Sequence, residues 1–321
     1  MTFSQLPPAY APTGQPLLCT LSAITAPVVE VQIHLSSHGV IGIKRFVNQS
    51  SVTFDLSPYL VRRAAFRIPL EESRVEVCSD RQLMVTLVAV TESEQIETAP
   101  FILRPARDAE SPTSLLTTLP TERLLARDEM DELTFLTRNP QPLQIVVTHR
   151  DGSVTSQTQV VPGSGLFRFR LVAADYPDAE QILVDGSPTA VVRYTLTAPL
   201  EGGVRIAWHS SRGSLEQYTF PVVKRMEQQV TKKYAYGADG YRTTHCESEE
   251  RMVLLSALES EEMMHALKEL LTAEQVWMLR DGAYEAVDVI SESSKINGEG
   301  HFSTLTLTLR SKFKNKPLCN S

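Results

Sequence analysis

Short runs of alternating apolar and polar residues fill the first hundred positions, and this period-two pattern constrains the fold more than any other feature. Val29, Val31 and Ile33 are separated by polar residues, and residues 52–56 repeat the pattern. Turn-forming segments such as 36–39 lie between the runs. Because successive side chains on a strand point to opposite faces of a sheet, such runs are typical of half-buried strands. Many short strands at near-regular spacing indicate a β-sandwich.

The same alternation continues through Val75, Val77 and residues 84–90, so we expect a first β-sandwich-like domain over residues 1–105. The segment that follows, 104–114, contains two prolines, four charged residues and several small polar ones. Such a composition predicts an exposed linker between two domains.

The alternation returns over residues 133–220, which predicts a second β-sandwich-like domain over residues 115–224. Near its start, residues 122–131 interleave leucine with charge, and this spacing suggests one or two helical turns. Residues 205–220 form the clearest hairpin pattern, with apolar-rich runs on either side of a Ser/Gly-rich turn. Gly213 can take the positive φ that such a tight turn needs.

The C-terminal region, residues 225–321, contains a clear helical pattern. Within residues 261–271, Met263, Leu267 and Leu270 form one apolar stripe. This stripe predicts a helix that packs on a sheet.

Strand signals follow this helix, and Ser260 precedes it as a credible N-cap. The Asp-Gly pair at 281–282 predicts a two-residue hairpin turn, and Trp277 is expected on a strand beneath the helix. Residues 302–310 form a final strand with three leucines on one face, against which the helical stripe should pack. The predicted fold class is therefore mainly β with an α+β C-terminal domain: two β-sandwich-like domains followed by an antiparallel sheet with one packed helix.

The overall composition is that of an ordinary globular protein, with 42% hydrophobic and 21% charged residues. The formal charge of −7 argues against a broad phosphate-binding face, so we expect no nucleic acid partner. The first residues lack the features of a signal peptide, and no run approaches the ~20 apolar residues of a membrane span. We therefore expect synthesis in the cytoplasm and no membrane span, although a chain trimmed of its signal would look the same.

The four cysteines, Cys19, Cys78, Cys246 and Cys319, have no C-x-x-C spacing, so zinc or iron–sulfur ligation is not expected. A Cys19–Cys78 disulfide is one alternative, but reduced cysteines that act as small hydrophobes are the interpretation we favour. The seven histidines are spread along the chain. We expect neither a metal site nor a cofactor.

Catalytic signatures are scarce. Residues 163–165 lack the spacing of a nucleophile elbow, and His245 and Cys246, as neighbours on a strand, point to opposite faces. A group of acidic residues is interpreted as a solvated face and a helix start rather than a cation site or a pair of glycosidase carboxylates. Its members are Glu247, Glu249, Glu250, Glu259, Glu261 and Glu262. We expect no catalytic residues and no enzyme.

The hairpin arrangement W-x-x-x-x-G-x-x-x-x-Y-T-F, which begins at Trp208, resembles a hairpin of tail and baseplate proteins from phages and prophages of gut Bacteroidetes. Residues 10–18 resemble the proline-bearing entry into the first β-domain of those proteins, and 52–60 is similar to the strand that closes it. The sequence from Met252 onward resembles their terminal module. The hairpin turn, 212–215, departs from the Gly-Gly and aromatic residue that such proteins often carry.

The resemblance implies a non-enzymatic structural subunit of a phage-like tail or baseplate, found in the bacterial cytoplasm when synthesised and then in the virion or phage-like particle. Its partners would be other tail or baseplate proteins and further copies of itself, bound through sheet edges and hairpins. On the hairpin, the residues expected to make these contacts are Trp208, His209, Arg212, Tyr218 and Phe220.

Two other classes remain open. The first is a surface or secreted carbohydrate-binding or adhesin module made of tandem β-sandwiches, in which Trp208, Tyr218 and Phe220 could form a sugar-stacking platform. In a sandwich such aromatic residues are more often core residues or cross-strand pairs. The second and weaker class is an enzyme of unrecognised type.

Overall fold

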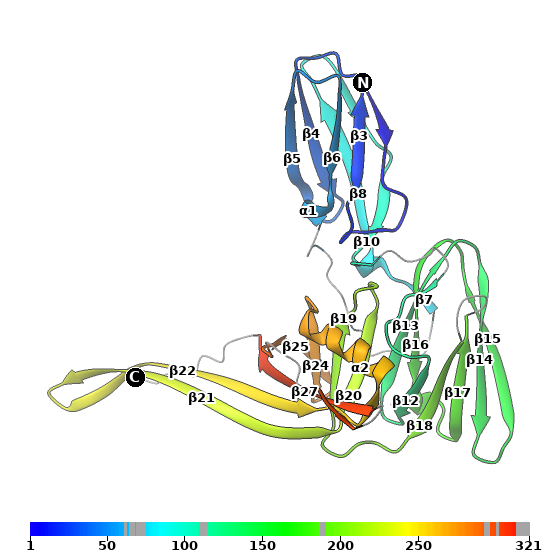
Figure 1. Ribbon diagram of the computed structural model, residues 1–321, viewed down its shortest axis with the longest axis vertical. Helices are drawn as coiled ribbons and strands as arrows, with labels where there is room; N and C mark the ends of the chain where they lie inside the picture. The colour runs from blue at the N-terminus through cyan, green and yellow to red at the C-terminus, as the bar shows by residue number, and fades with distance from the viewer. Residues whose placement is uncertain are drawn as a thin grey trace.

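The period-two runs at the N-terminus form strands in the computed structural model. The structure describes residues 1–60, 63, 68, 75–108, 114–186, 191–291, 296–299 and 302–312. The strands of the first sandwich are β1 (Thr2–Gln5), β2 (Ala11–Pro12), β3 (Leu18–Ser22), β4 (Val28–Leu35), β5 (Gly39–Val47), β6 (Ser51–Asp55), β8 (Leu83–Val90), β9 (Gln95–Glu97) and β10 (Phe101–Arg104). A sheet of order β1-β3-β6 packs on one of order β2-β10-β8-β4-β5, in which β9 also pairs with β8 (Figure 1). A one-turn helix, α1 (Ser57–Leu60), follows β6.

The core of this sandwich follows the predicted alternation. Every second residue of β4 from Val29 to Leu35 is buried. Cys19 lies in the same core, whereas Cys78 packs in a separate apolar cluster with residues of the second sandwich. Both thiols are free, so the Cys19–Cys78 disulfide is not formed and the two residues act as small buried hydrophobes.

One strand that we expected in the first domain lies elsewhere. β7 (Val75–Val77) pairs antiparallel with β16 (Gly165–Val172), a strand of the second sandwich, and a 3₁₀ turn (Ser79–Arg81) leads back to β8. In that turn Arg81 is fully buried and forms a 2.5 Å ion pair with Glu132. Alternation predicted the strand but not the sheet that it joins, because its partner strand is remote in sequence.

The second sandwich again consists of two sheets. Its other strands are β11 (Ser114–Leu115), β12 (Glu122–Ala126), β13 (Met130–Thr137), β14 (Gln141–His149), β15 (Val154–Val161), β17 (Ala179–Asp185) and β18 (Val191–Thr197). The sheet orders are β11-β13-β16-β7 and β12-β18-β17-β14-β15. A 3₁₀ turn (Ala173–Asp175) follows β16, and Phe135, Phe169 and Tyr194 lie in the core.

The expectation of helical turns over residues 122–131 is wrong, because β12 is a strand that pairs parallel with β18. The charges in this segment do not mark a solvated helix face. Arg123 is buried, and its guanidinium lies 2.8 Å from the buried carboxylate of Asp131. Leu125 is buried whereas Leu124 is exposed, as strand alternation requires.

The C-terminal part forms a nine-stranded antiparallel sheet of order β20-β19-β24-β25-β27-β22-β21, in which β23 and β26 also pair with β27. The strands are β19 (Val204–His209), β20 (Leu215–Phe220), β21 (Val222–Gly237), β22 (Gly240–Leu255), β23 (Glu259–Ser260), β24 (Val276–Arg280), β25 (Ala283–Val289), β26 (Ile296–Glu299) and β27 (Phe302–Ser311). The β19–β20 hairpin, which we expected in the second domain, belongs to this sheet through β24. The fold class is as predicted: mainly β, with two sandwiches and an antiparallel sheet that carries one helix.

The predicted helix is α2 (Glu261–Lys268), continued by a 3₁₀ turn (Glu269–Leu271). Ser260 caps it, since its Oγ accepts a hydrogen bond from the backbone N–H of Met263. Leu267 and Leu270 are buried in one cluster with the three leucines of β27, which confirms the predicted packing.

Trp277 does not lie beneath this helix. Its neighbours Val276 and Met278 are in the core under α2, whereas Trp277 points to the opposite face of β24 and packs on the core of the first sandwich. Because adjacent strand residues face opposite sides of a sheet, burying Val276 and Met278 sends Trp277 the other way.

Candidate assembly surface

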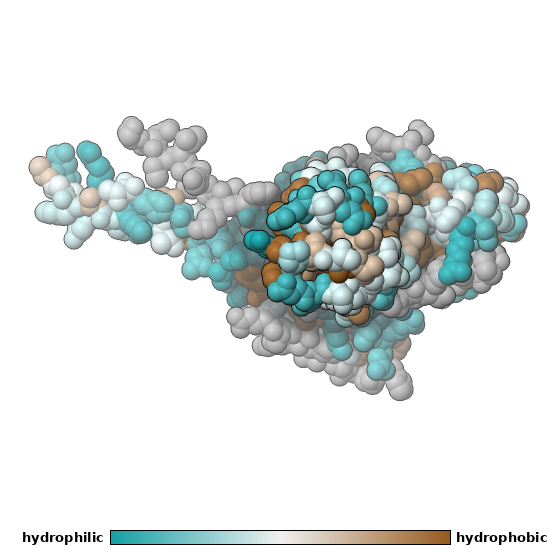
Figure 2. Space-filling model, turned by 90° about the horizontal axis from the view of Figure 1, so that it is seen from above, coloured by the Kyte–Doolittle hydropathy of each residue, from teal (hydrophilic) through white to brown (hydrophobic). Residues whose placement is uncertain are grey.

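A long two-stranded ribbon projects from the nine-stranded sheet (Figure 1). β21 and β22 have 16 residues each, yet β22 pairs with β27 only over Arg251–Leu255. Beyond that point, within the part of the chain that the structure describes, the two strands pair only with each other. We call residues 226–252 the arm; its root, where Arg251 and Met252 pair with β27, still belongs to the sheet. In Figure 2 it extends to the left of the rest of the protein, and the face in view is hydrophilic to neutral in hydropathy.

The register of the arm gives it two different faces. Residues directly opposite each other in an antiparallel pair share a face. One face therefore carries the pairs Met226–Met252, Gln228–Glu250, Val230–Ser248, Lys232–Cys246, Tyr234–Thr243 and Tyr236–Tyr241. The other face carries Arg225–Val253, Glu227–Arg251, Gln229–Glu249, Thr231–Glu247, Lys233–His245 and Ala235–Arg242. We call these the apolar face and the charged face.

The exposed apolar and aromatic side chains of the arm gather on the apolar face. They are Met226, Val230, Tyr234, Tyr236 and Tyr241. The two outermost tyrosines are 77% and 80% exposed. Exposed apolar residues that line up along one face, rather than being scattered, mark a surface that another molecule covers.

The tyrosines at the tip of the arm hold one another in place. The ring of Tyr241 lies edge-on to that of Tyr236, with 5.1 Å between centroids, and 6.4 Å from that of Tyr234. Such aromatic pairs favour one arrangement of the rings over others. The tip therefore presents a preformed aromatic cluster.

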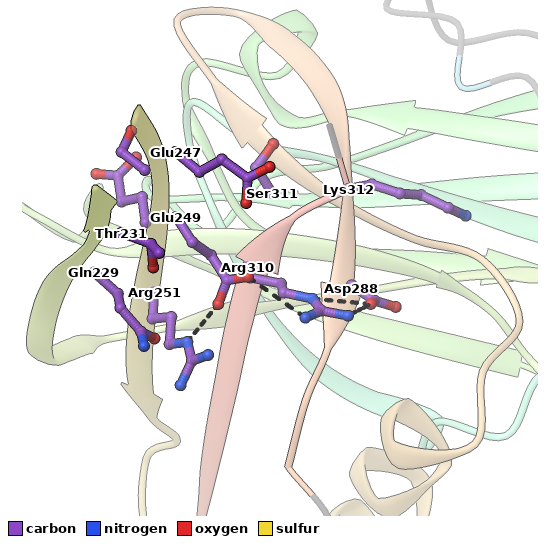
Figure 3. Close-up of a pocket in the computed structure, with 11 residues that line it drawn as sticks. Gln229, Thr231, Glu247, Glu249, Arg251, Asp288, Arg310, Ser311 and Lys312 are labelled. Atoms are coloured by element: carbon purple, nitrogen blue, oxygen red, sulfur yellow. Dashed lines mark hydrogen bonds and ion pairs between the residues drawn. The ribbon is translucent and has the colours of Figure 1, made fainter. Parts of the chain in front are cut away.

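Ion pairs brace the root of the arm on its charged face (Figure 3). Arg251 Nε lies 2.6 Å from Glu249, and this contact is the main reason that the pKa of Glu249 is lowered. Arg310 on β27 lies 3.5 Å from Glu249 and 2.8 Å from Asp288 on β25. These side chains line an open hollow of about 320 Å³. The pairs link β22, β27 and β25 at the point where the arm leaves the sheet.

The hairpin residues that sequence analysis proposed as contacts lie mainly in the interior. Trp208 and Phe220 are fully buried in the core under α2. Because both side chains are buried, they cannot contact another molecule, and they serve as core residues. The alternation that places them on strands also turns them toward the helix.

His209 and Arg212 bind other parts of the same chain. His209 Nε2 donates to the carbonyl oxygen of Pro105 at 2.8 Å, and an Arg212 guanidinium N–H donates to the carbonyl oxygen of Thr117 at 2.5 Å. Gly213 has a φ of +86°, as predicted, and a Cβ at this position would lie 2.8 Å from the Pro105 carbonyl oxygen. The β19–β20 turn is thus a joint between the two sandwiches and the sheet.

This joint also corrects the linker prediction. Residues 104–106 are buried against the β19–β20 turn, and residues 109–113 lie outside the part of the chain that the structure describes. Charge and proline suggested exposure because the sequence alone does not show that a turn about a hundred residues later covers this segment.

Tyr218 is half-buried and lines a cavity of about 510 Å³ between the second sandwich and the sheet. Its hydroxyl donates to Glu259 at 2.7 Å and accepts from the backbone N–H of Ala257 at 3.0 Å. Its ring packs edge-on against Phe220, 5.0 Å between centroids. Of the five proposed contact residues, Tyr218 therefore lies at the border between the core and this cavity: its ring packs against the core and its side chain lines the cavity.

No pattern described for residues 226–252 above predicts the arm. The spacing of Met226, Val230 and Tyr234 by four residues suits one face of a strand and also one face of a helix, so periodicity does not decide between them. The usable signal is the turn at 237–240, where two glycines separate Tyr236 from Tyr241. Within this turn, Asp239-Gly240 is an Asp-Gly pair of the kind that hairpin turns favour, and Gly240 has a φ of +92°.

Among the described residues, no cluster of three His, Cys, Asp or Glu side chains is placed to hold a metal ion. No described helix is long and apolar enough to cross a membrane.

Comparisons with known proteins do not assign a family. No protein-family model matches the chain, and no curated protein matches it. Among solved structures, a chain from the complex of Dpr2 Ig1-Ig2 with DIP-Theta Ig1-Ig3 is 11% identical; the match covers 62% of this chain and 99% of that one, with a TM-score of 0.18. A chain from a structure on host cell surface retention of a 1.5-MDa bacterial ice-binding adhesin is 7% identical; the match covers 76% of this chain and 86% of that one, with a TM-score of 0.16. These scores are too low to carry an argument.

Proposed function

We propose that this chain is a non-enzymatic structural subunit of a phage-like tail or baseplate, made in the bacterial cytoplasm and then built into the particle. Its work is assembly with neighbouring subunits. The sequence resemblance supports this role, and the two-faced arm supplies the surface through which such a subunit would act.

The arm is the observation that carries the proposal. A two-stranded ribbon on its own is marginally stable in water, because it has no second layer on which to bury its apolar face. Here Met226 is exposed at the edge of the sheet, and Val230 and the tip tyrosines lie beyond the last residues of β22 that pair with β27. An element of this kind gains stability when a neighbouring molecule covers it, which is what an assembly subunit provides.

The rest of the molecule is built to hold the arm in a fixed direction. The joint at the β19–β20 turn ties both sandwiches to the sheet through buried hydrogen bonds, such as that from Arg104 to Arg212. At the root, Arg310 ties the arm to β25 through Asp288. A subunit that places one arm on a rigid body suits a repeating assembly.

The test is affinity purification of the tagged native protein from cells in which the prophage has been induced. We expect it to be recovered with other tail components. A Tyr236→Ser/Tyr241→Ser variant should fold with an unchanged melting temperature, because both side chains are exposed, but should be depleted from particles.

The matched control is Lys233→Ser/Arg242→Ser, which changes two exposed side chains at a similar distance along the arm but on its charged face. This variant should enter particles like the wild type. Specific, saturable binding to a glycan by a protein that never enters particles would overturn the proposal and favour a carbohydrate-binding module.

A further inference from the structure

We propose that the arm binds the arm of a second copy of this chain, apolar face to apolar face and antiparallel, about a two-fold axis beside Val230. The proposal rests on the proposed function, since it names the partner of the surface that carries that function. It is argued from the placement of apolar and charged residues along the arm.

The extent of the apolar face favours a partner as long as the arm. From Met226 to Tyr236 the exposed apolar residues span about 35 Å at the usual rise of a strand. A small pocket would cover the tyrosines at the tip but would leave Met226 and Val230 in water. A lipid surface would have to bury the charged Lys232 and Glu250, which lie on the same face. A second ribbon covers the whole length, and two such ribbons can coil around each other with the twist of paired strands.

The charges on the apolar face are self-complementary. Among its cross-strand pairs it carries one cation, Lys232, and one anion, Glu250. Lys232 is two residues from Val230 toward the tip, and Glu250 is opposite Gln228, two residues toward the root. A two-fold axis beside Val230 therefore places Lys232 of each copy diagonally opposite Glu250 of the partner subunit, which gives two equivalent charge pairs in the interface.

Both groups are available for such a contact. Lys232 has no ion-pair partner among the residues that the structure describes, and its side chain is exposed. Glu250 forms a long ion pair of 3.8 Å with Arg280 of its own chain, but its side chain is 39% exposed, so it can also meet a lysine of a second copy. The same axis sets Met226 against Tyr234 of the partner subunit, which buries apolar surface on either side of the central Val230.

Pairing of two β21 edges is the alternative geometry, and the side chains argue against it. Edge pairing would leave the tyrosines and Met226 exposed on the ribbon's face. The outer strand also carries Lys232 and Lys233, and lysines on an edge strand discourage pairing with another edge. Face-to-face packing buries the apolar residues without using that edge.

A contact between two ribbons is at the low end of stable interface sizes. We therefore expect the isolated protein to dimerise weakly, and the particle to strengthen the contact by holding several copies together.

The first experiment is sedimentation equilibrium of the full chain over a range of protein concentrations. Lys232→Glu and Glu250→Lys should each weaken dimerisation by about tenfold or more, because every interface contains two such charge pairs. The double variant Lys232→Glu/Glu250→Lys restores opposite charges across the interface and should recover most of the wild-type association. Lys233→Glu is the matched control on the charged face and should leave the dimerisation constant unchanged.

The second experiment places a cysteine on the proposed axis. In a Cys246→Ser/Cys319→Ser background, which leaves the buried Cys19 and Cys78, Val230→Cys should be joined to a dimer by a short bis-maleimide, whereas Thr231→Cys, one residue away on the charged face, should not. Melting temperatures and circular dichroism establish that each variant is folded.

The arm contact would be overturned by a chain that stays monomeric at all concentrations. It would also be overturned if Lys233→Glu weakened dimerisation as much as Lys232→Glu, or if both cysteine positions cross-linked equally. A monomer that instead sediments with vesicles of phosphatidylcholine and phosphatidylglycerol would overturn it as well. Dimerisation as described by a protein that never enters particles contradicts the proposed function and supports the arm contact. Entry into particles that Lys232→Glu does not alter, with no dimer, contradicts the arm contact alone.

Discussion

The Nη1 atom of Arg104 donates a hydrogen bond to the carbonyl oxygen of Arg212, 2.6 Å away, and so joins the last strand of the first sandwich to the β19–β20 turn. The same guanidinium donates to the carbonyl oxygens of Tyr10 at 3.1 Å and Asp108 at 2.9 Å. Arg104 is only 1% exposed. One side chain therefore satisfies three carbonyl groups at the joint between the parts of the molecule.

Arg104→Met keeps an apolar stem of similar length and removes these donors. Carbonyl oxygens left without donors away from water are costly, so we expect a loss of about 3 kcal/mol in the free energy of unfolding, measured by urea denaturation. The control is Arg193→Met, whose ion pair with Glu122 is exposed and whose loss should cost no more than about 0.5 kcal/mol. Equal, small losses in both variants would show that the joint does not depend on Arg104.

Gly213→Ala tests how tightly the β19–β20 turn is seated. The variant meets two costs, a φ of +86° and a Cβ that would lie 2.8 Å from the Pro105 carbonyl oxygen. Gly282→Ala is the matched control, because its φ of +79° is similar but its Cβ would meet open space. Strain alone should cost about 1 kcal/mol in the control, and crowding should add about 1–3 kcal/mol at Gly213. Similar unfolding free energies for the two variants would contradict the tight joint.

His209 makes stability depend on pH. Burial lowers its pKa to about 4, because desolvation disfavours the imidazolium. Between pH 6.5 and 4 the unfolded chain binds a proton at this histidine that the folded chain excludes. The contribution of neutral His209 to the free energy of unfolding is therefore fully present above pH 6.5 and is lost as the pH falls toward 4. It amounts to about 3 kcal/mol.

The comparison variant is His209→Gln, whose amide can still donate to Pro105 but does not titrate. Urea denaturation at several pH values should show that the variant loses less unfolding free energy between pH 6.5 and 4 than the wild type does. His265→Gln, an exposed histidine on α2, should give the wild-type dependence. The prediction fails if the His209→Gln curve is as steep as the wild-type curve.

Leu267→Ala tests the packing of α2 on the sheet. Leu267 is fully buried among the leucines of β27, so the variant should lose about 2–5 kcal/mol through lost burial and the cavity that remains. His265→Ala on the exposed face of the same helix should change the unfolding free energy by no more than about 0.5 kcal/mol. An unchanged midpoint for Leu267→Ala would mean that the helix does not pack as described.

The local patterns of the sequence determined the elements that depend on neighbours in the chain. Alternation around Val29 and Val31 marked strands, the stripe through Leu267 marked the helix, and Ser260 marked its start. The turn at 281–282 was also evident, because a positive φ at both positions suits Asp-Gly. Each of these features is decided within a few residues, so the sequence displays it directly.

Only the tertiary structure decided where those elements went. β7 joined a sheet of the second sandwich, Arg123 was buried because Asp131 met it, and Trp208 became core because α2 lies over its strand. The arm emerged because β27 stops pairing with β22 at Arg251. Each outcome depends on contacts between residues far apart in sequence, and hydrophobic burial rewards any partner that covers a face. A local pattern therefore shows that a face needs covering, and the folded chain determines what covers it.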